Sequence, residues 1–287
     1  MKFSLIVCTY NRISDLNNCL NSLKALQYDD YEIIIIDQSD IINHELQYSN
    51  TVTYIHIKDI GLSHARNLAL KIASGEYICL VDDDATYDVN YLLNASKVID
   101  KYPNLGVLSG RIIDPNDGRL GVKGMMKENE YKIRTTQEVF SFCMSACCII
   151  KADIAIMEKF DERFGVGAQY GAGEETDIIW RIIYKGYSIL YTPSLKVYHR
   201  IYKKDKLDLE KVKKYNMAFG ALYAKHFLYY RKIAIFMFVF SLFKSFIGCA
   251  LFIFNDKLRT YYLSSLIYKL YGFKKFITTS VHAKNYL

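Results

Sequence analysis

Proline and paired cysteines are what this sequence has least of. It contains 3 prolines in 287 residues, and none of its 7 cysteines belongs to a Cys-x-x-Cys pair. Scattered cysteines argue against a structural zinc site or a disulfide framework, and they favour reduced thiols in a cytosolic compartment. The first eight residues carry one positive charge, a short apolar run and no small-residue cleavage site. We therefore expect a first strand there rather than a signal peptide.

Acidic residues are scarce in the last third of the chain. Residues 200–287 carry 17 Lys and Arg against 4 Asp and Glu, whereas residues 1–199 carry 20 against 26. The resulting net charges, +13 and −6, indicate a basic tail attracted to an anionic surface, either a membrane or a nucleic acid. The length allows one large α/β domain or two small ones, and we expect two regions, residues 1–202 and 203–287.

Short apolar runs alternate with stretches of helical periodicity over the first hundred residues. Such alternation predicts an α/β fold with a mostly parallel sheet and right-handed connections. Residues 114–137 are polar and contain glycine, so we expect an irregular excursion there that shapes one side of a ligand site. The predicted strands are 3–8, 31–36, 51–57, 77–81, 105–113 and 139–150, and the predicted helices are 14–26, 61–74 and 86–101.

One predicted strand, Tyr77–Val81, ends in three consecutive carboxylates, Asp82, Asp83 and Asp84. At the carboxyl end of a parallel strand, such acids face the crevice in which α/β folds bind ligands. Hard cations take oxygen ligands, and Mg2+ or Mn2+ often bridges one or two carboxylates to substrate phosphates. The acids thus indicate a metal–diphosphate site on Asp82 and Asp84, with a solvated acidic turn as the alternative.

Polar groups at two more strand ends, Thr9–Arg12 and Asp37, are expected at the same edge of the sheet. Taken together, four segments resemble the nucleotide-binding half of family 2 glycosyltransferases. That resemblance implies an inverting enzyme of the GT-A fold with a nucleotide-sugar donor, and it covers about residues 1–200. The order and spacing of the segments make the match more specific than any one motif. The segments are Cys8–Arg12, Asp37–Ser39, Gly61–Asn67 and Leu80–Ala85.

The resemblance implies a donor-binding role for each residue that matches the first two segments. Thr9 and Tyr10 would line the nucleoside pocket, and Asn11 and Arg12 follow them in the same loop. Asp37 would accept a hydrogen bond from the base. The alternative for each residue is ordinary loop or capping chemistry.

The other two segments carry the groups that the resemblance places against the sugar diphosphate. Arg66 and Asn67 would lie against the donor, although Arg66 could instead be a surface residue of its helix. Asp82 and Asp84 would be the outer members of the DxD motif, in contact with ribose and with Mg2+ or Mn2+. Asp83 stands between them and is also expected at the donor.

A second stretch of interest joins a glycine-rich loop to an apolar helix. The glycine spacing differs from Gly-x-Gly-x-x-Gly and no short strand precedes it, so we expect no dinucleotide site. The helix dipole stabilises acids in a first helical turn, which accounts for one or two of the three carboxylates. An inverting transfer also needs a general base for the acceptor hydroxyl, and a carboxylate at this junction could serve. The loop and its acids are Gly165, Gly167, Gly171, Gly173, Glu174, Glu175 and Asp177.

The family resemblance continues into this stretch. Gly173–Asp177 is similar to the family's Glu-Asp motif, whose second acid is the usual base, and by position that acid is Glu175. Because Asp is commoner there, Glu174 and Asp177 stay open as alternatives. In related enzymes a histidine near the position of His199 contributes to the metal–diphosphate site, and a structural histidine is the alternative. Small residues at Ser145–Cys148 suit either an approaching sugar or tight core packing.

The C-terminal region has helical and membrane-like features. Ile233–Phe254 is 22 residues long with one charge, Lys244, and its length would span a bilayer. A charge near the middle costs at least about 2.5 kcal/mol on insertion scales. Flanking cations fit a helix that lies in the interface, so we expect monotopic attachment to the cytoplasmic membrane face, with a buried helix as the alternative.

These observations lead to one hypothesis and two rivals. The hypothesis is transfer of a single sugar from a nucleoside-diphosphate sugar, expected to be a UDP-sugar, to a hydroxyl of a glycan or lipid-linked acceptor in surface polysaccharide assembly. Trp180-Arg181 does not form the QxxRW motif of processive synthases, which favours single transfer. The rivals are a nucleotidyltransferase, whose glycine-rich basic loop is missing after the first strand, and a non-catalytic membrane- or nucleic-acid-binding module. Because that module leaves the strand-end acids unexplained, we expect no nucleic-acid partner.

Overall fold

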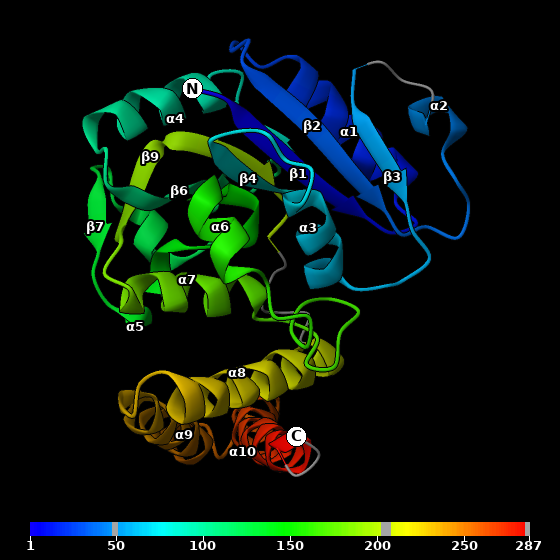
Figure 1. Cartoon of the computed structure of the whole chain (residues 1–287). Coiled ribbons are helices and arrows are strands. Elements are labelled where there is room, and N and C mark those ends of the chain that lie inside the picture. The colour runs from blue at the N-terminus through cyan, green and yellow to red at the C-terminus, as the bar shows by residue number, and fades with distance from the viewer. Residues whose placement is uncertain (48–50, 202–207, 285–287) are drawn as a thin grey trace. The chain divides into compact units, whose positions relative to one another are not determined.

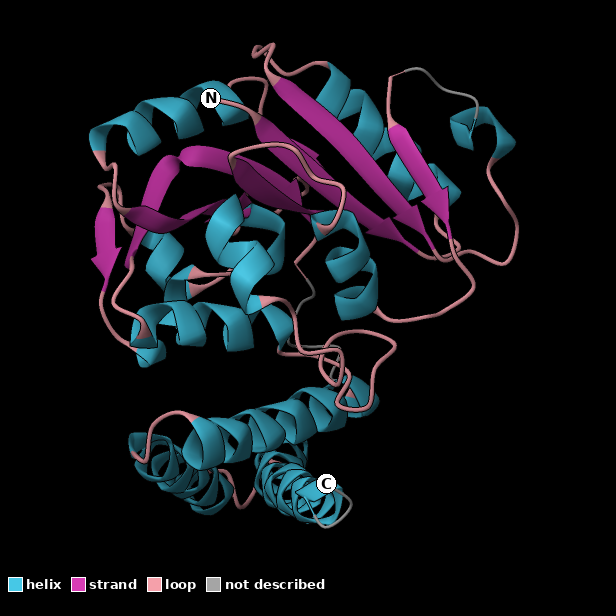
Figure 2. Ribbon diagram, viewed as in Figure 1, coloured by secondary structure: helices cyan, strands magenta, loops and turns pink. Residues whose placement is uncertain are grey.

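The computed structural model describes residues 1–47, 51–201 and 208–284. Two compact units are present, and each is discontinuous in the sequence. The first comprises residues 1–161 and 175–201, and the second comprises residues 162–174 and 202–287. The predicted boundary at residue 202 assigns residues 162–174 to the first region, whereas the structure groups them with the C-terminal helices. Figures 1 and 2 show the sheet with its flanking helices in the first unit, and the C-terminal helices of the second.

The amino-terminal half of the first unit is the expected parallel α/β arrangement. Strands β1, β2, β3 and β4 are all paired in parallel, in the order β3-β2-β1-β4. The central residues of β1, β2 and β4 are buried apolar side chains, as a sheet covered on both faces requires, whereas the edge strand β3 is partly exposed. The elements are β1 (Phe3–Thr9), α1 (Ile13–Lys24), β2 (Tyr31–Asp37), α2 (His44–Gln47), β3 (Thr53–His56), α3 (Leu62–Leu70) and β4 (Tyr77–Asp82).

The rest of the sheet adds antiparallel pairs to the expected parallel core, so the whole sheet is mixed. Strand β8 lies between β4 and β6 and is antiparallel to both, and β5 and β7 are antiparallel to β9. Only β6 and β9 continue the parallel pattern. The elements are β5 (Ala85–Tyr87), α4 (Tyr91–Lys101), β6 (Leu105–Ile113), η1 (Lys123–Met126), β7 (Tyr131–Ile133), α5 (Thr136–Phe142), η2 (Ser145–Cys147), β8 (Cys148–Lys151), α6 (Ala152–Glu158), α7 (Glu174–Tyr184) and β9 (Ser188–His199).

The predicted strand 139–150 is helical in its first part. Helix α5 begins at a capping box in which the Thr135 side chain accepts from the Glu138 backbone N–H and the Glu138 side chain accepts from the Thr135 N–H. These two bonds satisfy amide donors that a helix start leaves unpaired. The apolar residues of 139–142 therefore form one face of a helix, and the strand is confined to Cys148–Lys151.

Strand register brings the polar strand ends together at one edge of the sheet. Thr9 is the partner of Asp37 in the β1–β2 pair, and Cys8 is the partner of Asp82 in the β1–β4 pair. His199 is the last residue of β9, and in the β5–β9 pair it is the partner of Ala85, the residue after Asp84. The antiparallel β5–β9 pair thereby brings His199 back to the end of β4.

The second unit consists of α8 (Leu209–Tyr229), α9 (Ile233–Leu251), α10 (Asp256–Lys284) and the loop 162–174. Helices α8 and α10 cross closely, because a Cβ on Gly220 would clash with the backbone of Lys269 and one on Gly272 with that of Met217. The loop is anchored by aromatic contacts: Phe164 and Tyr170 lie 6.3 and 5.9 Å, centroid to centroid, from Phe276 of α10.

All four glycines of this loop have positive φ angles, between 73° and 98°. Residues other than glycine rarely adopt such φ angles. The glycine spacing therefore serves the path of the backbone, and it brings the chain to the start of α7 at Glu174.

Candidate donor and metal site

Two acids of β4's carboxyl end and one histidine of β9 form a cluster with metal-ligand character. Ligand atoms of Asp82, Asp84 and His199 all lie within 4.8 Å of one another, and each side chain is partly exposed. The His199 Nε2 is 3.0 Å from Asp84 Oδ1. Two carboxylate oxygens and one imidazole nitrogen, open to solvent, suit a divalent ion such as Mn2+ that keeps positions for substrate oxygens. The residues that the sequence singled out as metal ligands thus fit the ion.

The pKa values of the two acids in the cluster shift in opposite directions. The hydrogen bond from His199 lowers the pKa of the Asp84 carboxyl, and the same bond raises the pKa of the His199 imidazole. Burial raises the pKa of the Asp82 carboxyl, although the charges of Arg66 and His199 oppose that shift. Asp84 and His199 thus favour each other's charged forms, while Asp82 gains charge stabilisation when a cation is near.

The middle acid of the triplet faces the first loop. Asp83 is buried and accepts from the Thr9 hydroxyl at 2.7 Å, and burial raises the pKa of its carboxyl. The Arg12 guanidinium lies 3.2 Å from Asp83 and 3.0 Å from Asp84. Arg12 is half exposed, so it can present part of its charge to a ligand while it bridges both carboxylates. Thr9, Arg12 and Asp83 therefore sit within the cluster that the sequence predicted.

Asp37, the last residue of β2, is buried. Its carboxylate accepts from the Tyr54 hydroxyl at 2.6 Å and from the Ser39 backbone N–H at 2.8 Å. Burial and the hydrogen bond to Asp37 raise the pKa of Tyr54 to about 12, which keeps the phenol protonated as a donor. Tyr54 was not among the predicted site residues, and only its position in β3 opposite the end of β2 could have indicated it.

The first loop is tied to the segment after β2. Asn11 has a left-handed φ of 53°, and its side chain exchanges hydrogen bonds with Asp40 at 2.8 and 3.1 Å. Its backbone N–H also donates to the Ser39 hydroxyl. Tyr10 is 42% exposed, so its ring is available to a ligand. A donor-binding role for Asn11 and Tyr10 stays a prediction.

Arg66 and Asn67 of α3 take different roles. Arg66 is 1% exposed, which excludes the alternative of a surface residue. Its guanidinium lies 3.5 Å from Asp82 and donates to the Ser145 hydroxyl, which itself donates to Asp82 at 3.1 Å. Ser145 thus joins the site as a second support of Asp82, a role suggested in the sequence only by the run of small residues.

The Asn67 side chain is bonded to the backbone of Phe160. Its amide group donates to the Phe160 carbonyl at 2.9 Å and accepts from the Phe160 N–H at 2.8 Å. The Phe160 ring in turn lies 5.4 Å from the Arg66 guanidinium carbon. Asn67 therefore fixes the ring that covers Arg66, and direct contact with a donor stays a prediction.

The three acids of α7 differ in burial. Asp177 is fully buried and pairs with Arg181 at 3.0 Å, and Arg181 also bonds Glu158 at 2.7 Å. Glu174 is 4% exposed, whereas Glu175 is partly exposed. A general base must reach an acceptor hydroxyl, so burial and ion pairing disfavour Asp177 and leave Glu175 as the most accessible of the three.

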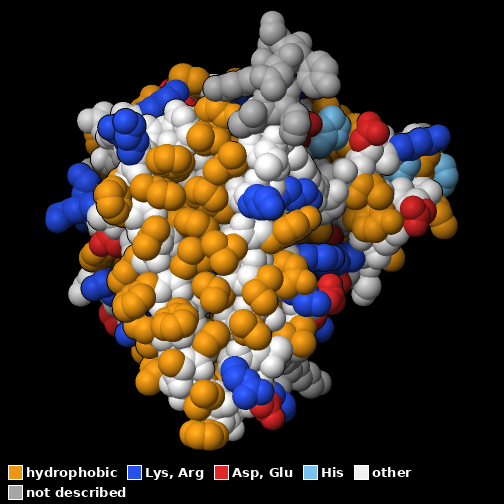
Figure 3. All heavy atoms as spheres, turned by 90° about the horizontal axis from the view of Figure 1, so that it is seen from below, with side chains coloured by type: hydrophobic (Ala, Val, Ile, Leu, Met, Phe, Trp, Pro, Cys, Tyr) orange, Lys and Arg blue, Asp and Glu red, His pale blue; other side chains and the backbone are white. Residues whose placement is uncertain are grey.

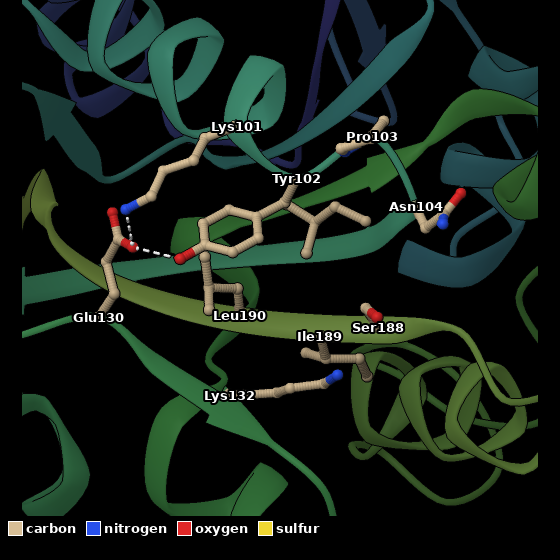
Figure 4. Close-up of a pocket in the computed structure, with 10 residues that line it drawn as sticks. Lys101, Tyr102, Pro103, Asn104, Glu130, Lys132, Ser188, Ile189 and Leu190 are labelled. Carbon is tan, nitrogen blue, oxygen red and sulfur yellow. Dashed lines mark hydrogen bonds and ion pairs between the residues drawn. The ribbon is translucent and has the colours of Figure 1, made fainter.

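A cavity of about 450 Å³ lies elsewhere in the first unit. It is lined by Tyr102, Glu130 and Ser188 among others, and Figure 4 shows Glu130 joined to Lys101 and Tyr102. Ser188 begins β9, whereas His199 ends it. The cavity therefore lies at the opposite end of β9 from the metal cluster, and it is separate from the predicted donor site.

The chain belongs to glycosyl transferase family 2, whose family model matches residues 4–156. This match favours the glycosyltransferase hypothesis over the nucleotidyltransferase alternative. It covers every residue of the strand-end cluster except His199.

Two relatives of the chain are named as glycosyltransferases. The chain is similar to a poly(ribitol-phosphate) β-glucosyltransferase of Bacillus spizizenii, with 32% identity over 54% of this chain and 26% of that protein. It is also similar to the putative glycosyltransferase EpsH of Bacillus subtilis, with 32% identity over 31% of this chain and 27% of that protein. The chain spans only about a quarter of the length of these relatives.

Solved structures confirm the GT-A type of fold. Staphylococcus aureus TarS, residues 1–349, superposes with a TM-score of 0.61 at 18% identity, over 94% of this chain and 91% of that one. A mannosyltransferase of Pyrobaculum calidifontis in complex with GDP-Man and Mn2+ gives a TM-score of 0.62 at 15% identity, over 94% of this chain and 87% of that one.

Proposed function

We propose that this chain is an inverting, metal-dependent glycosyltransferase that moves one sugar from a UDP-sugar to a hydroxyl of a glycan or lipid-linked acceptor. The observation that carries the proposal is the meeting of Asp82, Asp84 and His199 at the end of β4, in a chain of family 2. Relatives named for poly(ribitol-phosphate) and a TarS structure with UDP-GlcNAc support a surface-polymer acceptor and a UDP-sugar donor.

The chain's own residues supply positioning and charge. Asp82, Asp84 and His199 would hold Mg2+ or Mn2+, which when bound neutralises charge on the departing diphosphate. Arg66 and Ser145 keep Asp82 oriented toward the ligand side. Glu175 is the proposed base that takes the proton of the acceptor hydroxyl.

We further propose that the second unit attaches the enzyme to a membrane surface on the cytoplasmic side. Of the described helices, α9 is the one that is long and apolar enough to cross a membrane, and only 22% of its most apolar window is buried. Its exposed face carries large side chains, and Figure 3 shows a broad hydrophobic area with cations among and beside it. The exposed large apolar residues of α9 are Ile233, Phe236, Val239, Phe240, Phe243, Phe246, Ile247 and Leu251.

Attachment in the interface explains the packing of α9 better than a single span does. The opposite face of the helix is buried in the second unit, with Phe238 stacked on Phe273 of α10 at 4.2 Å between centroids and Gly248 against the Tyr262 ring. One apolar face thus serves the helix packing and the other stays open. A surface helix with an open apolar face and nearby cations binds at the headgroup boundary.

Calorimetric titration with UDP, with and without Mn2+, tests the donor site. We expect UDP binding to the wild type to depend on Mn2+ and to be lost in Asp84→Asn, because one of the metal's two carboxylates is gone. Glu175→Gln is the matched comparison, since it should bind UDP normally and transfer no sugar from a panel of UDP-sugars. Binding of a different nucleoside diphosphate would change the donor, and no binding of any nucleotide would overturn the enzyme proposal.

A further inference from the structure

A chain of hydrogen bonds links α8, α9 and α10 in the second unit, and it ends at Lys269, which is partly exposed. Lys269 of α10 donates to the Ser245 hydroxyl of α9 at 3.2 Å, and Ser245 is 3.0 Å from Ser265. Ser265 donates to Asn216 of α8 at 2.8 Å. Ser245, Ser265 and Asn216 are all less than 9% exposed, so this is a buried and connected set of hydrogen bonds.

The lysine at the end of this chain of hydrogen bonds has a second lysine as its electrostatic neighbour. Lys244 of α9 is exposed and lies close enough to lower the pKa of Lys269, in addition to the effect of burial. Among the described residues, neither lysine forms an ion pair with a carboxylate, and the sequence of α9 contains no Asp or Glu. Lys244 directly precedes Ser245 in the sequence, and the Lys269 ammonium donates to the Ser245 hydroxyl, so both lysines lie at the same turn of α9.

The surroundings of this pair are apolar. Phe240 lies under the Lys244 ammonium at 4.5 Å from the ring centroid, and Phe243 and Phe246 are more than half exposed on either side of Lys244 along the helix. The Lys269 ammonium is partly withdrawn from water, and an anion would offset the desolvation cost of its charge. The Ser245 hydroxyl already bonds Ser265 and the Ser241 carbonyl. It therefore does not need Lys269 as a hydrogen-bond partner.

We propose that Lys244 and Lys269 form a binding site for the phosphate of an anionic membrane lipid. The proposal rests on the membrane attachment proposed above, which puts the apolar face of α9 at the depth of the headgroups. Two ammonium groups attract a phosphate as point charges, and juxtamembrane lysines each add to binding of anionic leaflets. The Ser245 bond holds Lys269 in place before the lipid arrives, which reduces the ordering cost of binding.

Vesicle co-sedimentation of the full chain tests the site. The vesicles are phosphatidylcholine alone and phosphatidylcholine mixed with phosphatidylglycerol. The double variant Lys244→Gln and Lys269→Gln should lose at least about tenfold in affinity for the mixed vesicles and keep its binding to phosphatidylcholine. The matched control is Lys257→Gln with Lys274→Gln, which removes two exposed lysines of α10 and should lose clearly less.

Each other outcome has a defined meaning. Equal losses in the two double variants would overturn the site in favour of diffuse attraction by the basic tail. Inorganic phosphate that abolishes binding of the wild type to mixed vesicles at millimolar concentration would reassign the site to free phosphate. No binding of the wild type to either vesicle would overturn the membrane attachment itself. The single variant Lys244→Gln, at an exposed position, guards against misfolding, and Mn2+-dependent UDP binding reports on the donor site separately.

Discussion

His199 and Asp84 are 115 positions apart in the sequence, yet the His199 Nε2 lies 3.0 Å from Asp84 Oδ1. The contact is a product of the antiparallel β5–β9 pair, in which His199 is registered with Ala85. The cluster of Asp82, Asp84 and His199 is therefore completed by the last residue of β9, outside the 4–156 segment that the family model matches.

Replacing His199 by alanine should weaken Mn2+ binding in the presence of UDP by at least about tenfold, because the cluster loses one of its three ligand atoms. The measurement is calorimetric titration of Mn2+ into the UDP-saturated protein. His44→Ala, an exposed histidine of α2, is the matched control and should bind as the wild type does. Unchanged Mn2+ affinity in His199→Ala would show that the histidine supports the strand end structurally and does not hold the ion.

Asp177→Asn should lower the free energy of unfolding by about 3 kcal/mol, because it removes one partner of a buried ion pair. This loss of stability is at the lower end of what removing one partner of a buried ion pair costs, since Arg181 keeps its bond to Glu158. Urea denaturation followed by tryptophan fluorescence measures the change through Trp180. Glu175→Gln should leave the unfolding curve unchanged while it abolishes transfer. A stable Asp177→Asn variant without activity would instead make Asp177 the base.

Gly220→Ala should destabilise the chain by about 1–3 kcal/mol, because the added methyl group would meet the Lys269 backbone at the α8–α10 crossing. Helix propensity alone predicts the opposite sign, a gain of about 1 kcal/mol for the same change. Thermal unfolding decides between the two, since the sign of the change in Tm is enough. A rise in Tm would mean that α8 and α10 are farther apart in solution.

The partly buried position of Lys269 predicts a pH dependence of stability. Burial and Lys244 lower the pKa of Lys269 from 10.5 to about 8, so the unfolded chain binds this proton more tightly than the folded chain does. The cost of the charge is fully present below about pH 8, and this contribution to stability rises as the pH goes from about 8 to 10.5. The total is of the order of 3 kcal/mol.

Lys269→Met isolates that contribution. At pH 7 the variant should unfold at a higher temperature than the wild type, and the difference should shrink as the pH approaches 10.5. Differential scanning calorimetry at several pH values in lipid-free buffer gives the comparison. A variant that is less stable than the wild type at pH 7 would show that the Ser245 hydrogen bond outweighs the desolvation of the ammonium group.

Much of the donor edge could be predicted from the sequence because its residues are local to strand ends. The acids after β4 and the loop after β1 stand where periodicity ends, and parallel register alone brings them together. Antiparallel β8 could not be predicted in the same way, because the capping box of α5 divides an apolar run that reads as one strand. The bond between Asn67 and the Phe160 backbone, 93 positions away, likewise leaves no local pattern.

The acids at the start of α7 show a different limit. Sequence spacing offers Glu174, Glu175 and Asp177 as equivalent carboxylates, and only burial distinguishes them. Arg181 pairs with Asp177 and so disfavours it as the base. It lies one helical turn away, so the sequence shows the two residues as an i,i+4 pair. Its second partner, Glu158, comes from α6 and could be found only in three dimensions.

The discontinuity of the two units has a consequence for how such a protein can change over generations. A single recombination event near residue 202 would import new C-terminal helices but keep the old loop 162–174, whose Phe164 and Tyr170 pack on Phe276. In the hybrid, the loop would lose its packing partner Phe276. This loop directly precedes the helix that carries Glu175. Lineages that exchange the basic tail must therefore exchange or rewrite this loop as well, so the two segments are expected to diversify together.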